Sequence, residues 1–255
     1  MNHSKTDYEI IQKDFYRDGK RIDGQLYLPN LPWCPLVIIC HGFGGSRRRG
    51  IPYAQGFAEN GIAAYIFEFI GGGEDIRSDG KMTEMSVLTE ARDLEIILDG
   101  LKKLPEIDRN NIFLMGRSQG GYVATLVGAE RKDEIKGLLL HYPAYVIQDD
   151  VIERTGNGER FEPLSSFLGH TVSDIYDRDA YSVDIYARMR RFTGTVLILH
   201  GSDDQTVPIS YSYEAVETFP HADLVTIEGA GHGFENNDDL KARELSLNFI
   251  KENCS

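Results

Sequence analysis

The 255-residue sequence predicts an α/β fold, in which one domain is built on an open, mostly parallel, doubly wound sheet of about eight strands and carries a small inserted cap. Six apolar, β-rich runs alternate with helical patterns along most of the chain. These runs are continuously apolar, which suits parallel strands covered on both faces. The length is within reach of one large domain. In such a sheet, ligands bind beyond the carboxyl ends of the strands.

Local patterns predict the hairpin, the helices and the strands of this fold. A hairpin around Asp18 and Gly19 predicts that the first strands are antiparallel. Apolar positions recur at intervals of three and four from Val87 to Leu101, which indicates an amphipathic helix after Thr83. A last helix is expected over about residues 238–251. The six strand candidates are residues 35–40, 63–69, 111–116, 137–142, 195–201 and 224–229.

One long segment, from about residue 147 to residue 192, interrupts the alternation. It is rich in charge, glycine and tyrosine and separates two strand candidates. A connection of this length inside a compact domain is usually a lid or a subdomain, and the aromatic content argues against disorder. The predicted domain therefore covers residues 1–255 and includes this segment as the cap.

The composition excludes several classes of function. A formal net charge of −13 disfavours nucleic acid as a partner, and the run Ser46 to Gly50 (SRRRG) is expected to be a solvated loop edge. The amino end lacks the apolar core of a secretion signal, and no stretch is long enough to cross a bilayer, so a cytoplasmic protein without membrane contact is expected. Three cysteines without metal-ligand spacing predict neither disulfides nor a metal site, and Cys40 is expected in the core. A homodimer is left open.

Ser118 is the candidate nucleophile. It lies between Gly116 and Gly120 in the stretch LMGRSQGGYVA, where a strand candidate ends and a helix candidate begins. A serine there could equally cap the helix, and G-x-S-x-G alone is a weak signal. A strained strand-to-helix turn, however, requires small residues two positions before and after the nucleophile. The surrounding pattern therefore favours a nucleophile.

A serine nucleophile needs a histidine and an orienting carboxylate, here in the chain order Ser, Asp, His. Asp204 lies three residues after Gly201 at the end of a strand candidate, and His232 lies in the glycine-flanked loop EGAGHGFE. Asp203 is the alternative acid. Asp204 is preferred because the pattern from Gly201 to Val207 is expected to leave its side chain at the tip of the loop.

Two backbone N–H groups are expected to stabilise the oxyanion. One belongs to Gln119, which follows the nucleophile, and the other to Phe43 in the HGFGG loop. His41 is expected to hold this loop in shape, and His200 is also expected to be structural. Hydrolysis needs only water, so no cofactor or metal is expected.

The motifs HGFGG, GRSQGG, HGSDDQTVP and GAGHGF at these spacings resemble the α/β-hydrolase superfamily, and specifically its bacterial cinnamoyl (feruloyl) esterase branch. The resemblance covers about residues 22–249 and includes the pair Ile185 and Tyr186. It implies a serine carboxylester hydrolase that acts through an acyl-enzyme on hydroxycinnamate or similar aryl esters, that is, on a small-molecule ester. Two features depart from the branch: Arg117 stands where histidine is usual, and residues 67–80 replace its typical loop.

The cap is expected to supply the substrate pocket. The resemblance favours Asp150, seven residues after Pro143, as the acceptor for a ring hydroxyl, with Asp149 as the alternative and Tyr186 as a second contact. Two other functions stay open: an acyl-peptidase or general short-chain carboxylesterase, and a non-catalytic binding protein. Dienelactone hydrolysis is disfavoured because serine, not cysteine, occupies the elbow. Aromatic walls are expected from Tyr145, Phe161, Phe167, Tyr176, Tyr181 and Tyr186.

Overall fold

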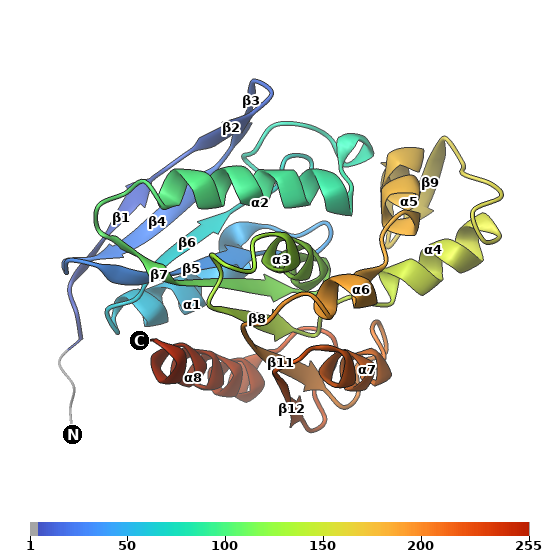
Figure 1. Cartoon of the computed structure of the whole chain (residues 1–255). Coiled ribbons are helices and arrows are strands. Elements are labelled where there is room, and N and C mark those ends of the chain that lie inside the picture. Colours follow the sequence, from blue (N-terminus) through green and yellow to red (C-terminus); the bar gives the residue numbers. More distant parts are fainter. Residues whose placement is uncertain (1–4, 255) are drawn as a thin grey trace.

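The structure is a computed structural model that describes residues 5–254, so the first four residues and the last residue of the predicted domain lie outside it. Its centre is an eight-stranded sheet in the order β1-β4-β6-β5-β7-β8-β11-β12 (Figure 1). β1 and β4 are antiparallel to their neighbours, and all the later strands are parallel. The strands of this sheet are β1 (Tyr8–Gln12), β4 (Gly24–Pro29), β5 (Cys34–Cys40), β6 (Ala63–Phe67), β7 (Ile107–Arg117), β8 (Gly137–His141), β11 (Thr195–Gly201) and β12 (Ala222–Ile227).

All six predicted strands are present, as β5, β6, β7, β8, β11 and β12. The predicted hairpin is formed by β2 (Phe15–Arg17) and β3 (Lys20–Ile22), and its turn residues Asp18 and Gly19 both have positive φ. The largest difference is at β7, which begins four residues before the predicted strand. Its first residues pair with Cys34 across a register shift, and their polar side chains hide this extension from a search for apolar runs.

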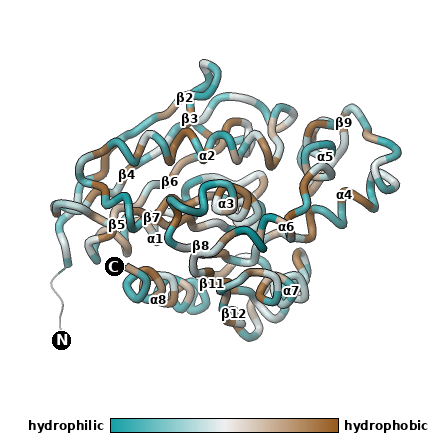
Figure 2. The backbone as a smooth tube through the Cα atoms, in the orientation of Figure 1, coloured by the Kyte–Doolittle hydropathy of each residue, from teal (hydrophilic) through white to brown (hydrophobic). Residues whose placement is uncertain are grey.

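Helices cover both faces of the sheet. α2 (Val87–Leu101), α3 (Gln119–Glu130) and α7 (Ser210–Thr218) pack on one face, and α1 (Ile51–Ala58) and α8 (Asn236–Asn253) pack on the other. Along α2 the tube in Figure 2 alternates between brown and teal, as the predicted amphipathic pattern requires. Ser86 caps this helix by accepting a hydrogen bond from the Thr89 N–H, so the helix begins at Val87.

The predicted cap corresponds to the elements between β8 and β11. Figure 1 shows them beyond the ends toward which the parallel strands point. They therefore lie at the edge of the sheet where ligands bind in this class of fold. These elements are α4 (Ile147–Thr155), β9 (Leu164–Phe167), β10 (His170–Ser173), α5 (Asp174–Tyr181) and α6 (Ile185–Met189). Within residues 5–254, no helix has both the length and the apolarity needed to span a bilayer.

Candidate active site

Ser118 occupies a sharp turn between β7 and α3. Its φ of 50° is unfavourable for a residue with a side chain, and its hydroxyl makes no helix-capping hydrogen bond. The neighbouring glycines are required by space: a Cβ on Gly116 would lie 2.2 Å from the Gly120 carbonyl oxygen, and a Cβ on Gly120 would lie 2.4 Å from the His41 carbonyl oxygen. The turn is therefore the strained elbow that the sequence predicts, and Ser118 does not cap the helix through its side chain.

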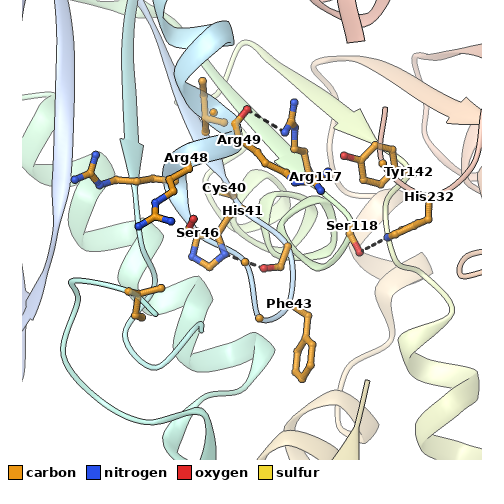
Figure 3. Close-up of a pocket in the computed structure, with 18 of the residues that line it drawn as sticks. Cys40, His41, Phe43, Ser46, Arg48, Arg49, Arg117, Ser118, Tyr142 and His232 are labelled. Atoms are coloured by element: carbon orange, nitrogen blue, oxygen red, sulfur yellow. Dashed lines mark hydrogen bonds between the residues drawn. The ribbon is translucent and has the colours of Figure 1, made fainter. Parts of the chain in front are cut away.

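The structure brings Ser118, His232 and Asp204 into one hydrogen-bonded chain. The Ser118 hydroxyl donates to His232 Nε2 at 3.0 Å, as drawn in Figure 3. His232 Nδ1–H donates in turn to Asp204 Oδ2 at 2.7 Å. The Tyr142 ring packs edge-on against the His232 ring at 4.8 Å between centroids. A serine, an imidazole and a carboxylate in this order can activate the hydroxyl as a nucleophile.

Asp204 is buried, whereas its side chain was expected at the tip of the loop. Burial by itself raises the pKa of this carboxyl, but hydrogen bonds from His200, His232 and the Val207 N–H outweigh it and hold the pKa below its ordinary value. Asp203 does not reach His232 and instead accepts from the Ser202 hydroxyl at 3.0 Å. Of the two candidate acids, Asp204 is therefore the one in contact with the histidine.

His200, which was expected to be structural, contacts the catalytic candidate Asp204 directly. Its ring is fully buried, and Nε2–H lies 2.9 Å from the Val207 carbonyl oxygen and 3.2 Å from Asp204 Oδ2. The Ser212 hydroxyl donates to Nδ1 at 2.6 Å. His200 and His232 thus both contact Oδ2 of Asp204. His200 and Asp204 are only four residues apart, but no motif in the sequence marks this contact.

The backbone N–H groups of Phe43 and Gln119 lie beside Ser118. Both residues line the same cavity as Ser118, and within residues 5–254 neither N–H donates to a protein acceptor. Free, fixed N–H donors next to a nucleophile can stabilise an oxyanion. Both predicted donors are therefore free to accept this role, which stays a prediction.

His41 holds the loop that contains Phe43. Its Nδ1–H donates to the Gly42 carbonyl oxygen at 2.8 Å, and its Nε2 accepts from the Phe69 N–H at 3.1 Å. Burial lowers the pKa of His41 to about 4, which keeps the ring neutral with one donor and one acceptor. This arrangement agrees with the role expected from the sequence.

The Gln119 side chain is fixed by two residues, Glu90 and Tyr176, that no sequence motif marks as its partners. Its Nε2 donates to Glu90 Oε2 at 2.9 Å, and its Oε1 accepts from the Tyr176 hydroxyl at 2.8 Å. Burial raises the pKa of Glu90 to about 8. Glu90 lies in α2 and Tyr176 in α5, so this network joins the residue after Ser118 to the elements between β8 and β11.

Replacing Glu90 with glutamine is expected to remove a pH dependence of stability. In the folded protein the carboxyl keeps its proton up to about pH 8, whereas an unfolded glutamate loses it near pH 4.5. Between these values the folded state binds more protons, so the free energy of unfolding falls as pH rises. Urea unfolding at pH 5 and pH 8 should show a smaller fall for Glu90→Gln than for the wild type. Equal falls in both proteins would contradict a raised pKa at Glu90.

Two cavities meet at Ser118 and Phe43. The wide cavity, of about 480 Å³, is lined by His232, the residues from Ile39 to Gly50, and Asp75, Ile76, Arg117, Ser118, Tyr142 and Gly233. The narrow slot, of about 70 Å³, is lined by Phe43, Ser118, Gln119, Ala144, Val146, Ile147, Asp150, Phe167, Leu168, Tyr176, Thr206 and Val207. His232 borders the wide cavity, and the elements between β8 and β11 border the narrow slot.

The structure separates the predicted substrate contacts. Asp150 lines the slot, and no ion-pair or side-chain hydrogen-bond partner is present for its carboxylate in residues 5–254. Asp149 lies outside the slot, where its carboxylate accepts from the Tyr211 hydroxyl at 2.7 Å. The prediction for Tyr186 is not met, because α6 turns this side chain away and its hydroxyl donates to Glu214 at 3.0 Å.

Only some of the expected aromatic walls border the slot. Phe167 and Tyr176 do so. Phe161 and Tyr181 instead pack against each other with ring centroids 5.9 Å apart. Tyr145 is buried against Thr125. The sequence could place these rings in one segment but could not say which of them face Ser118.

The expectation of a solvated loop edge holds for Arg48 and Arg49, which are exposed, but not for Arg47. Residues Arg47–Gly50 form a short 3₁₀-helix, η1, that lines the wide cavity. Arg47 is buried, and its guanidinium pairs with Asp23 at 2.9 Å and donates to Gln25 at 2.7 Å. Arg117, the departure from the esterase branch, is also buried. It lies over the Tyr53 ring and donates to the Arg49 carbonyl oxygen at 3.1 Å.

Within the described residues, no group of three or more His, Cys, Asp or Glu side chains is arranged to hold a metal ion. The three cysteines are free, and Cys40 is buried in the core as expected.

The chain is similar to proteins of known structure and to curated relatives. Est1E from Butyrivibrio proteoclasticus, solved with bound ferulic acid, superposes with a TM-score of 0.87 at 27% identity, covering 94% of this chain and 98% of that one. The monoglyceride lipase of Rattus norvegicus is 25% identical over 84% of this chain and 80% of its own length. An uncharacterised 31.7 kDa protein of Escherichia coli is 36% identical, but that match spans only 34% of this chain and 30% of the relative.

A family model for hydrolases, described as serine aminopeptidase S33, matches residues 33–178. This range holds the Phe43 loop, the elbow with Ser118 and most of the elements between β8 and β11. The match covers more than half of the chain and agrees with the sheet order and the hydrogen-bonded Ser118, His232 and Asp204. The chain is therefore an α/β-hydrolase and belongs to the Hydrolase_4 (serine aminopeptidase S33) family.

Proposed function

We propose that this protein is a serine carboxylester hydrolase that acts through an acyl-enzyme on Ser118, with hydroxycinnamate or similar aryl esters as substrates. The observation that carries the proposal is the chain of hydrogen bonds from Ser118 through His232 to Asp204, next to the free N–H groups of Phe43 and Gln119. The hydrolase family and the similarity to Est1E and to a lipase support the reaction class.

In the proposed acylation step, Ser118 Oγ attacks the ester carbonyl carbon while its proton passes to His232 Nε2. The oxyanion accepts hydrogen bonds from the Phe43 and Gln119 N–H groups. The bond between the carbonyl carbon and the alcohol oxygen then breaks, and His232 returns the proton to that oxygen. A water molecule repeats the sequence on the acyl-enzyme, which releases the acid and restores Ser118.

We assign the two halves of the ester to the two cavities from the position of His232. His232 must protonate the leaving alcohol, so the alcohol lies on the side of the wide cavity that His232 borders. The acyl group then enters the narrow slot. The slot has apolar walls and one carboxylate, that of Asp150, which is the combination a hydroxylated aromatic ring requires.

Asp150→Ala is expected to lower kcat/KM for methyl caffeate and methyl ferulate about 10-fold to 100-fold, while methyl cinnamate and short-chain nitrophenyl esters lose much less. Only the hydroxylated rings can donate a hydrogen bond to the Asp150 carboxylate. The measurement is a set of steady-state rates on these esters and on an aminoacyl nitroanilide, which tests for peptidase activity.

Asp149→Ala is the matched control, because Asp149 precedes Asp150 in the same helix but contacts Tyr211 outside the slot. Equal losses on every ester for Asp150→Ala would remove hydroxyl recognition from the proposal. Cleavage of the nitroanilide without cleavage of any ester would overturn the ester hydrolase itself.

The size of the slot favours a second candidate, a short-chain carboxylesterase. A slot of about 70 Å³ accepts a short acyl group as it stands. A hydroxycinnamoyl group is larger than this volume, so it requires side chains that line the slot to move aside. Nitrophenyl acetate turned over far more efficiently than methyl ferulate would favour this second candidate.

A further inference from the structure

The η1 segment places two unpaired cations in the wall of the wide cavity. Arg48 and Arg49 both line this cavity and are exposed. In the part of the chain that the structure describes, neither guanidinium has an acidic partner or a hydrogen-bond acceptor. Their neighbour Arg47, by contrast, is neutralised by Asp23. The cavity wall thus offers two guanidinium groups with free donors.

Arg49 lies close to the reacting groups. A Cβ built on Gly233, the residue after His232, would lie 3.2 Å from Arg49 Nη1. Arg49 lines the wide cavity and does not line the narrow slot. Its charge therefore belongs to the cavity that His232 borders.

The backbone that carries these arginines is anchored at both ends. Arg47 is tied to Asp23 and Gln25, and the Arg49 carbonyl oxygen accepts from Arg117. At Gly50 a Cβ would lie 2.9 Å from the Ile66 side chain, so the segment packs closely on the sheet. Because the backbone is already fixed, less conformational entropy is lost when a ligand binds to the two side chains.

The charge of the wide cavity is opposite in sign to the formal net charge of the protein, which is −13. Among the described residues that line the wide cavity, Asp75 is the one carboxylate. Arg117 faces Asp239 at 3.6 Å, and Arg47 faces Asp23, so these two arginines are compensated from outside the cavity. The remaining charges, from Arg48, Arg49 and Asp75, leave the cavity positive and attractive to an anion.

We propose that the wide cavity binds an alcohol half that carries an anionic group, a carboxylate or a phosphate, through Arg48 and Arg49. A guanidinium matches both of these anions with paired N–H donors. This inference rests on the proposed function, because it takes the cavity beside His232 as the site of the alcohol. The preferred substrates are then esters between an acid that fits the slot and an anionic hydroxy compound.

The test uses three esters with the same acetyl group and different alcohol halves: 4-acetoxybenzoate, 4-acetoxyphenyl phosphate and the neutral 4-acetoxybenzamide. In the double variant Arg48→Gln/Arg49→Gln, the ratio of kcat/KM for an anionic ester to that for the neutral ester should fall about 10-fold, and added salt should lower the wild-type ratio. Differences in leaving-group reactivity between the esters cancel when this ratio is compared between the wild type and the double variant. The anionic ester whose kcat/KM falls more in the double variant shows whether the site prefers a carboxylate or a phosphate.

Arg109→Gln is the control variant. Arg109 is exposed, has no acidic partner within residues 5–254, and lies at the end of β7 opposite Ser118. It should leave the ratio unchanged. Ratios that are equal in the wild type and the double variant would overturn the anion site, while the proposed esterase would stand because the neutral ester is still cleaved.

A binding measurement keeps the inference testable without turnover. Calorimetric titration of the Ser118→Ala protein with 4-hydroxybenzoate and with phenyl phosphate should detect binding of at least one anion, and that binding should weaken about 10-fold when Arg48→Gln and Arg49→Gln are added. 4-Hydroxybenzamide serves as the neutral reference. If the anions bind no better than this reference, the inference is wrong. If the anions bind in this way but the wild-type protein cleaves none of the esters, the proposed function would be refuted and the anion site retained.

Discussion

Ser118→Ala is expected to lower ester hydrolysis by about 10⁶-fold and to abolish covalent labelling by a fluorophosphonate. The Ser118 hydroxyl is hydrogen-bonded to His232 Nε2 at 3.0 Å, so it can transfer its proton as it attacks the ester. Alanine keeps the Cβ at this turn, and the circular dichroism spectrum and thermal unfolding should therefore stay close to those of the wild type.

Two other serines test the assignment. Ser46 lines the wide cavity, but in the described residues its hydroxyl has no hydrogen bond to a histidine. Ser202 lies close to the acid loop, and its hydroxyl donates to Asp203. Mass spectrometry should find the label on Ser118 alone. A label on Ser46 or Ser202, with Ser118 unmodified, would overturn the proposed nucleophile.

Asp204→Asn is expected to lower kcat by about 10⁴-fold and to leave the protein folded, as the same change does in other Ser-His-Asp triads. Asp204 Oδ1 accepts from the Thr206 and Val207 N–H groups, and an amide oxygen can keep these two bonds. The amide NH₂ then faces His232 Nδ1, which must accept a hydrogen bond and lose its proton. Nε2 becomes protonated in this tautomer and can no longer take the proton of Ser118.

Asp203→Asn is the matched control for this substitution. The two aspartates are adjacent, but the Asp203 carboxylate accepts from Ser202 and does not contact the imidazole. Steady-state kinetics should show a much smaller effect for Asp203→Asn than for Asp204→Asn. The reverse order of effects would mean that the acid is misassigned, although the serine and the histidine would keep their proposed roles.

The sequence by itself determined the sheet and the order of the groups around Ser118. Parallel strands buried on both faces must be continuously apolar, so β5, β8 and β11 could be recognised without any knowledge of their partners. The glycines around Ser118 report a backbone so tightly packed that a Cβ on Gly116 or Gly120 would overlap it. Asp204 and His232 follow parallel strands whose ends meet at one edge, which makes their approach predictable.

Only the tertiary structure decided which side chains surround these groups. Asp150 and Tyr186 lie in different helices of one irregular segment, and helix packing places Asp150 in the slot but turns Tyr186 toward Glu214. Glu90 reaches Gln119 from another helix, and no local pattern records that contact.

The arginine run shows the same limit. A sequence window contains three similar charges, and it cannot report that Asp23, distant in the chain, pairs with Arg47 and leaves Arg48 and Arg49 free beside Ser118. The periodicity of strands and helices acts between neighbours in the chain and can therefore be recognised in the local sequence. The partners of buried charges depend on long-range packing, and only the folded chain specifies them.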